Sequence, residues 1–210
     1  MIPLTVAEEL RQTLLDYLDT TFAFRDDAIS TAMQRFLTDP ENGLFKGPFV
    51  HIRLPFERAA TGAVDNILDV KPPFTPFAHQ LQAFKRLASR EQKPQHTLVT
   101  TGTGSGKSEC FLYPILDHCA RIKEGIGDTS GIKAVLLYPM NALAEDQARR
   151  VAEAIYADDR LRGKVTAGMY VGGTGKYKVM GAANVITHKP TLRKTPPDIL
   201  LTNYKMLLTL

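Results

Sequence analysis

The chain has 210 residues, is 44% hydrophobic and carries a formal net charge of +4, so it can bury one substantial core or one core plus a small helical unit. It contains no run of about 18 consecutive apolar residues, which argues against a membrane-spanning helix. Glu8, Glu9 and Arg11 interrupt the segment where a signal peptide needs its apolar stretch. We therefore expect a globular, cytoplasmic protein with no membrane partner.

The positive charge is concentrated in the last quarter of the chain. Residues 160–210 contain nine Lys and Arg but one acidic residue, Asp198, whereas residues 1–70 contain six basic and eleven acidic residues. This asymmetry favours a polyanionic partner for the C-terminal part, although a solvated lysine-rich loop would explain the charge equally well.

Cysteine and histidine spacing argues against disulfide and metal sites. Cys110 and Cys119, the only two cysteines, lie about two and a half turns apart on one expected helix, too far to be bridged. No histidine has cysteine or carboxylate neighbours at metal-ligand spacing.

Residues 6–36 are expected to form two helices separated by a polar break at residues 25–27. The apolar residues that recur at helical spacing are Leu10, Leu14, Leu18 and Phe22, followed by Ile29, Met33 and Phe36. Residues 42–76 are rich in Gly, Pro and Phe without a sustained period and predict an irregular linker. We place a helical N-terminal region with its linker over 1–70 and a second domain over 71–210.

The second domain alternates strand-like and amphipathic segments. The expected strands are HTLVT at 96–100, KAVLLY at 133–138, TAGMYV at 166–171 and DILLT at 198–202. Amphipathic segments that end near Lys123 and that span 141–156 lie between them. This alternation predicts an α/β fold, in which helices cover a parallel sheet.

The stretch TTGTGSGKS, residues 100–108, follows the first expected strand and opens a helix. Glycines let backbone N–H groups approach an anion closely, and the helix N-terminus adds partial positive charge. Lys107 could then reach the β and γ phosphates of ATP, and the Ser108 hydroxyl could ligate Mg²⁺. The expected nucleotide-binding residues of this loop are Thr101, Gly102, Thr103, Gly104, Ser105, Gly106, Lys107 and Ser108.

Two observations limit that interpretation. The usual phosphate-loop pattern has glycine at the position that Thr101 occupies here. The same letters could also form an ordinary surface turn between a strand and a helix.

The segment TGTGSGKSECFLYPIL at 101–116 resembles motif I of the superfamily 2 DExD/H-box (DEAD/DEAH-box) helicases. Four further segments resemble other motifs of that family, in the family's order: PFAHQLQAF its Q motif, LLYPMNALAEDQ motif Ia, YVGGTG the double-glycine motif and DILLTNYKML motif Ib. The resemblance implies a P-loop NTPase (RecA-like) lobe over about 72–210, closest to large bacterial Lhr-like helicases. Some of these act in DNA repair or phage defence, so the implied partners include the remainder of a helicase or a repair or defence complex.

The resemblance also implies roles for single residues. Gln80 would contact the adenine edge of ATP, and Phe74 or Phe77 could stack on the base. Taken alone, a solvated helix residue is the less favoured alternative for Gln80. The residues expected to contact DNA or RNA are Pro139, Asn141, Gln147, Gly172, Gly173, Lys176, Lys178, Thr202 and Asn203.

Those contacts are expected to be made to the nucleic-acid backbone, because few aromatic residues interleave with the basic stretch. Asn141 is expected to cap its helix, and Leu143, Val151 and Ile155 to face the core. In isolation, the glycine and Thr-Asn pairs could be turns, and the helix that begins at 141 could simply be well capped.

The family's catalytic carboxylates are missing from this sequence: no acidic residue follows Thr202, and the basic stretch before it contains no DE pair. We therefore expect the front half of an ATP-binding motor lobe, an incomplete sheet that binds ATP and nucleic acid without hydrolysing ATP. The alternative is a non-enzymatic nucleotide- or DNA-binding module that docks on an intact helicase or competes with it. An unrelated P-loop enzyme such as a kinase is a third hypothesis.

Overall fold

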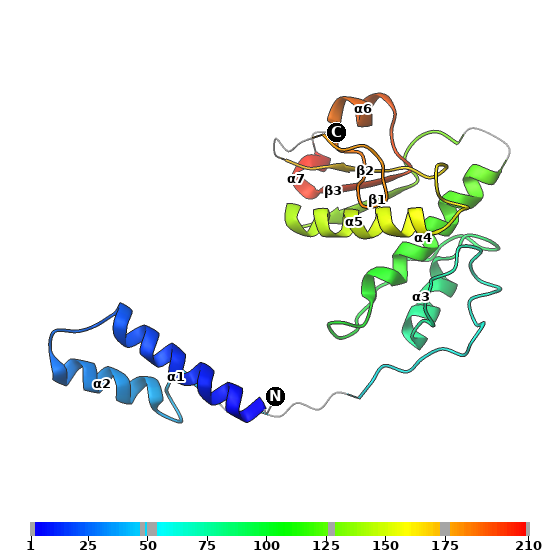
Figure 1. The fold of residues 1–210 in the computed structure, drawn as a ribbon. Coiled ribbons are helices and arrows are strands. Elements are labelled where there is room, and N and C mark those ends of the chain that lie inside the picture. Colours follow the sequence, from blue (N-terminus) through cyan, green and yellow to red (C-terminus); the bar gives the residue numbers. More distant parts are fainter. Residues whose placement is uncertain (1–2, 47–48, 50–53, 126–128, 173–176, 209–210) are drawn as a thin grey trace. The chain divides into compact units, whose positions relative to one another are not determined.

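The structure is a computed structural model that describes residues 3–46, 49, 54–125, 129–172 and 177–208 (Figure 1). The chain divides into two compact units, Met1–Pro55 and Phe56–Leu210. Each unit has its own architecture and is described separately.

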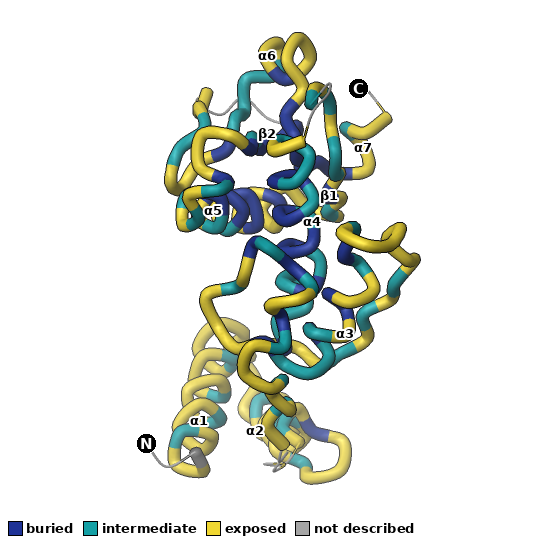
Figure 2. Tube along the Cα trace, turned by 90° about the vertical axis from the view of Figure 1, so that its right-hand side faces the viewer, coloured by how far each residue is buried: buried dark blue, intermediate teal, exposed yellow. Residues whose placement is uncertain are grey.

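The first unit is a helical hairpin formed by α1 (Pro3–Thr21) and α2 (Asp27–Thr38), as the apolar periodicity predicts. The polar break contains the N-cap of α2: the Asp26 carboxylate accepts hydrogen bonds from the N–H groups of Ala28 and Ile29 at 2.8 and 3.3 Å. None of the α2 residues is buried, and Figure 2 shows both helices as mostly exposed. The hairpin therefore has little core of its own.

The second unit contains a three-stranded sheet and its covering helices. In chain order its elements are α3 (Ala78–Leu87), α4 (Lys107–Glu124), β1 (Ala134–Tyr138), α5 (Asn141–Ala157), β2 (Ala167–Tyr170), α6 (Lys189–Lys194), β3 (Ile199–Asn203) and α7 (Tyr204–Leu207). The strand order is β1-β3-β2 and both pairings are parallel, with Leu136 and Met169 flanking Leu201. Three of the four expected strands are thus confirmed.

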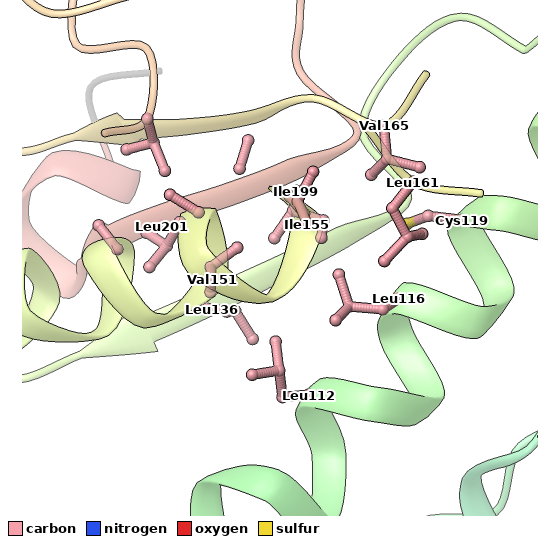
Figure 3. Packing of buried hydrophobic residues seen from close by; sticks show 14 of the residues in the cluster. Leu112, Leu116, Cys119, Leu136, Val151, Ile155, Leu161, Val165, Ile199 and Leu201 are labelled. Carbon is pink, nitrogen blue, oxygen red and sulfur yellow. The ribbon is translucent and has the colours of Figure 1, made fainter. Parts of the chain in front are cut away.

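Helices α4 and α5 contribute to one core against the sheet, and α6 packs on the opposite face (Figure 1). Figure 3 shows this core, in which Leu116 of α4 and Ile155 of α5 lie near Ile199 of β3. Val151 and Ile155 are buried as expected, whereas Leu143 is exposed, which corrects its predicted place in the core. Leu143 belongs to the first turn of α5, where that side of the helix is not covered.

Residues 56–70, part of the expected linker, belong to the second compact unit. Residues 56–70 are irregular, but the carboxylate of Asp117 in α4 accepts hydrogen bonds from the N–H groups of Asp69 and Val70 at 2.6 and 2.9 Å. A hydrophobic cluster joins the same segment to α3 and α4 through Val64, Leu68, Phe84, Ala88 and Tyr113. Through these contacts, residues 56–70 pack against α3 and α4 as part of the second unit.

The expected strand at 96–100 is wrong in this structure: residues 93–102 have no regular secondary structure, and Leu98 is 87% exposed. A strand needs a neighbour for its backbone hydrogen bonds, and β1 forms its ladder with β3 alone among the described residues. A strand-like sequence was therefore not sufficient to form a strand here.

Within the described ranges, no helix is long and apolar enough to cross a membrane. Nor do the residues that the structure places include three or more His, Cys, Asp or Glu grouped to hold a metal ion. Cys110 and Cys119 are buried and unpaired, in agreement with their spacing.

Candidate nucleotide and nucleic-acid site

The glycine-rich loop turns tightly into the start of α4. Gly104 and Gly106 have φ values of +78° and +71°, a conformation that side-chain-bearing residues rarely adopt. Helix α4 then begins at Lys107, so its first N–H groups face the loop. The loop therefore combines left-handed glycines with a helix N-terminus, two features that anion-binding turns use.

The side chain of Lys107 is hydrogen-bonded to the backbone of the loop. The ammonium donates hydrogen bonds to the carbonyl oxygens of Thr101 and Gly102 at 2.9 and 2.8 Å. Ser105 is fully buried, and its hydroxyl lies 2.5 Å from the Thr101 hydroxyl. The loop thus holds the lysine charge against its own carbonyl groups, while Gly102, Thr103 and Gly104 remain exposed.

Gln80 joins the segment before α3 to the loop. Its side-chain oxygen accepts a hydrogen bond from the Phe77 N–H at 2.8 Å, and its amide nitrogen donates to the Gly106 carbonyl at 2.9 Å. His79 Nε2 lies 2.9 Å from the Ser105 carbonyl. In this structure the Gln80 amide is therefore engaged within the protein, and its contact with adenine stays a prediction.

A small aromatic cluster adjoins the loop through His79. The Phe77 ring stacks on the His79 ring at 5.7 Å, and Phe56 packs against both at 5.4 and 5.5 Å. Phe74 instead contacts Tyr113 in the core. The sequence analysis did not predict a role for Phe56 or His79. Phe56 is visible in the segment LPFERA, but no local pattern indicates that it packs against Phe77.

Gly106→Ala is expected to weaken Mg-ATP binding by roughly tenfold more than Gly104→Ala. Both positions have positive φ, so both variants carry the same backbone strain. A Cβ at Gly106 would lie 2.4 Å from the buried Gln80 amide nitrogen, whereas a Cβ at Gly104 meets nothing within 4 Å. Calorimetric titration with Mg-ATP measures the difference; equal affinities would show that the Gln80 contact does not shape the loop.

A second group of candidate residues meets at the carboxyl ends of the strands. Asn141, the first residue of α5, donates from its amide to the Gly172 carbonyl at 3.2 Å, and its amide oxygen accepts from Asn203 at 2.7 Å. The Asn203 oxygen accepts from the Met206 N–H and caps α7. The expected cap by Asn141 is wrong: α5 has no side-chain cap, because this amide joins the ends of β2 and β3 instead.

The other predicted nucleic-acid residues differ in accessibility. Thr202 is fully buried, and its hydroxyl donates to the Tyr170 carbonyl at 2.6 Å, so it is not placed to meet a phosphate. Gln147 is also buried. Pro139 and Lys178 are exposed. Gly173 and Lys176 lie outside the described residues.

Asp198 lies at the opposite, amino-terminal edge of the sheet and is 2% exposed. Its carboxylate pairs with Lys123 and Lys133 at 3.0 and 2.8 Å and accepts from the Thr166 N–H at 2.8 Å. Burial would raise the pKa of Asp198, but the hydrogen bonds from Lys133, Thr166 and Lys123 outweigh it and lower that pKa. Asp198, the one acidic residue of the basic C-terminal stretch, thus stabilises the fold by joining α4 to the sheet.

The ion pair with Asp198 also places one end of α4. Lys123, in the last turn of this helix, contacts the amino edge of the sheet, so the C-terminal end of α4 lies there. Helix α5 begins at the opposite, carboxyl edge through Asn141 and Asn203. Figure 1 shows α5 beginning at the edge at which parallel sheets bind ligands, whereas the N-terminus of α4 lies beside α3, away from that edge.

Comparison with known proteins adds independent information. Residues 77–210 match the family model described as DEAD/DEAH box helicase. The chain is 28% identical over 160 residues to the Druantia protein DruE of Escherichia coli (strain UMEA 4076-1), a match that covers 69% of this chain and 9% of that protein. It is 28% identical over 119 residues to the uncharacterized ATP-dependent helicase YprA of Bacillus subtilis (strain 168), covering 55% of this chain and 14% of YprA.

A third relative is the uncharacterized ATP-dependent helicase MJ1574 of Methanocaldococcus jannaschii, 29% identical over 130 residues, with 60% of this chain and 17% of the relative covered. The matches span less than a fifth of the length of these three relatives. No solved structure is significantly similar to this chain.

Proposed function

This chain belongs to the DEAD/DEAH box helicase family, and from that premise we propose that it binds Mg-ATP at the loop 101–108 and a nucleic-acid backbone at the carboxyl edge of its sheet. The parallel three-stranded sheet with flanking helices fits the RecA-like α/β fold of that family. The observation that supports ATP binding best is the Lys107 ammonium, held by the Thr101 and Gly102 carbonyls of a turn with two left-handed glycines.

The residues around the loop fit a magnesium nucleotide. Bound ATP would supply phosphate oxygens, and the Ser108 hydroxyl at the start of α4 could share Mg²⁺ with them and with water. Lys107 would exchange its two carbonyl acceptors for phosphate. The cluster of Phe56, Phe77 and His79 would then offer an aromatic face to the adenine, while Gln80 keeps the loop in place.

We propose binding rather than hydrolysis for the described residues. Hydrolysis needs a carboxylate at the strand ends to hold Mg²⁺ and another to orient water. Asp198 is committed to two lysines at the opposite edge, and Glu109 beside the loop is paired with Arg150. ATP turnover by the purified chain, with and without single-stranded DNA, tests this: DNA-stimulated turnover would contradict it.

For nucleic acid, the supporting observation is the meeting of Asn141, Gly172 and Asn203 at one edge, beside a chain segment rich in exposed cations. Amide and backbone groups of this kind contact phosphates and sugars, which position a strand without selecting its sequence. The similarity to YprA and MJ1574, whose names are those of ATP-dependent helicases, supports a role within a larger helicase, with the rest of such a protein as partner. A defence or repair complex, which the family resemblance implied, is a further proposed partner.

We expect the double variant Lys178→Gln, Lys194→Gln to bind single-stranded DNA more weakly and with a flatter dependence on salt. Each lost phosphate contact should reduce the slope of log K against log salt by about 0.7. Lys85→Gln, which removes an exposed charge from α3, is the control and should leave the slope unchanged. Fluorescence anisotropy at several salt concentrations measures these slopes. An unchanged slope in the double variant would exclude this segment from the phosphate path.

A further inference from the structure

The segment between β2 and α6 presents an exposed aromatic ring that neither the nucleotide site nor the backbone contacts use. Tyr177 is 76% exposed. Its ring centroid lies 4.5 Å from that of His188, with the two planes at 80°. His188 is fixed in turn, because its Nδ1 lies 2.7 Å from the Thr191 hydroxyl. The imidazole therefore supports the phenol ring from one side, while most of that ring stays open to solvent.

The backbone beneath this pair is anchored to the sheet. The Lys178 N–H donates to the Thr187 hydroxyl at 2.8 Å, and the Thr187 N–H donates to the Lys178 carbonyl at 3.1 Å. Next to Thr187, Ile186 runs parallel to β2, and its carbonyl accepts from the Met169 N–H at 2.8 Å. The backbone that carries the Tyr177 ring is thus hydrogen-bonded to the sheet. This order lowers the entropy cost of binding a ligand against the ring.

The surroundings of the ring combine apolar surface with positive charge. Beside it lies a hollow of about 420 Å³ lined by Tyr177, Lys178, Val179, Met180, Ile186, His188 and Thr191. Val179 is exposed like the tyrosine. Lys178 on this segment and Arg193 and Lys194 in α6 are exposed, and Asp198, the one acidic residue between β2 and β3, is bound to lysines at the far edge of the sheet. A planar, apolar group that carries negative charge suits such a place.

The position of the ring continues the edge already described. The stretch around Ile186 runs in the same direction as β2, so Thr187 and His188 lie toward the end at which β2 stops, at Tyr170. The Gly172 carbonyl, two residues beyond that end, accepts from Asn141. Tyr177 therefore lies beyond β2, on the side away from β3, and toward the same carboxyl end of the strands as the Asn141–Asn203 group.

We propose that Tyr177, supported by His188, is a base-stacking subsite for one nucleotide of a single-stranded nucleic acid whose phosphates follow Lys178 and its basic neighbours. The inference rests on the proposed nucleic-acid binding and assigns to that surface a contact with bases as well as with the backbone. Stacking on a tyrosine accepts every base, so the subsite adds affinity without adding sequence preference.

The test compares Tyr177→Ala and Tyr177→Phe with the wild-type chain in binding to a single-stranded DNA and a single-stranded RNA of mixed sequence. Tyr177→Ala should weaken binding about 5- to 100-fold, the range for losing one stacked base, and should keep the salt slope. Tyr177→Phe keeps the ring and should bind like the wild type. Tyr17→Ala removes an exposed tyrosine from α1 and serves as the matched control.

A second measurement separates stacking from a change in the loop. An oligonucleotide in which 2-aminopurine replaces the adenines should lose fluorescence when it binds the wild type and Tyr177→Phe, and much less when it is saturated with Tyr177→Ala. If the wild type binds neither DNA nor RNA, the proposed nucleic-acid function itself fails. If the wild type binds and Tyr177→Ala binds equally well, the function stands and the stacking subsite is excluded. A weaker Tyr177→Phe, or a changed salt slope in Tyr177→Ala, would likewise overturn it.

Discussion

Lys107→Ala is expected to abolish measurable Mg-ATP binding, with a loss of at least about 100-fold in affinity. The Lys107 ammonium is the cation that the loop itself positions, through the carbonyls of Thr101 and Gly102. A phosphate in the turn would lose its strongest charge-assisted hydrogen bonds, which backbone N–H groups alone cannot replace. Calorimetric titration of the purified chain with Mg-ATP gives the affinity directly.

The control for Lys107→Ala is Lys85→Ala, which removes an exposed lysine from α3 and should bind Mg-ATP like the wild type. The thermal unfolding midpoint should change little in either variant, because neither ammonium lies in the hydrophobic core. If Lys107→Ala keeps its fold and its ATP affinity, the loop is a surface turn and the assignment of a phosphate site is wrong.

Asp198→Asn is expected to lower the free energy of unfolding by about 3–5 kcal/mol, the typical cost of breaking a buried ion pair on one side. The asparagine leaves Lys133, whose side chain is 8% exposed, without its carboxylate partner. It also weakens the link between α4 and the sheet, because Lys123 binds the same oxygen. Urea denaturation at pH 7 followed by circular dichroism measures the change.

The exposed pair of Asp159 and Arg162 provides the matched control, since the Asp159 side chain is 92% exposed. Asp159→Asn should change the unfolding free energy by less than about 1 kcal/mol. An equally small effect of Asp198→Asn would mean that the buried cluster contributes nothing to the fold.

The same cluster predicts a sign for the dependence of stability on pH. Because the pKa of Asp198 is lowered in the folded state, its contribution is present above the ordinary pKa of an aspartate, about 3.9, and is lost as pH falls through the lower folded value. The difference between wild type and Asp198→Asn should therefore shrink in acid and be constant near neutrality. A difference that grows below pH 4 would contradict the lowered pKa.

The local sequence was enough to predict the helices, most strands and the glycine-rich turn, because these depend on residues close together in the chain. The apolar period of 3.6 residues located α1, α2, α4 and α5, and three apolar runs located β1, β2 and β3. The glycine-rich stretch 102–106 indicated a turn before Lys107, and the structure has one there, with left-handed backbone at Gly104 and Gly106. Each of these features follows from the preferences of a few adjacent residues, so it can be derived before the fold is known.

Tertiary structure decided how those elements use their side chains. The strand-like residues 96–100 form no strand, because a strand depends on hydrogen bonds to a neighbour that no local pattern supplies. Asn141 reaches Gly172 and Asn203 rather than its own helix, and Thr202 bonds to Tyr170 inside the sheet. Polar side chains bond to whichever partner the packing brings within about 3 Å, and those partners lie tens of residues away in the sequence. That is why the order of the motifs could be predicted from the sequence, while the contacts that join them could not.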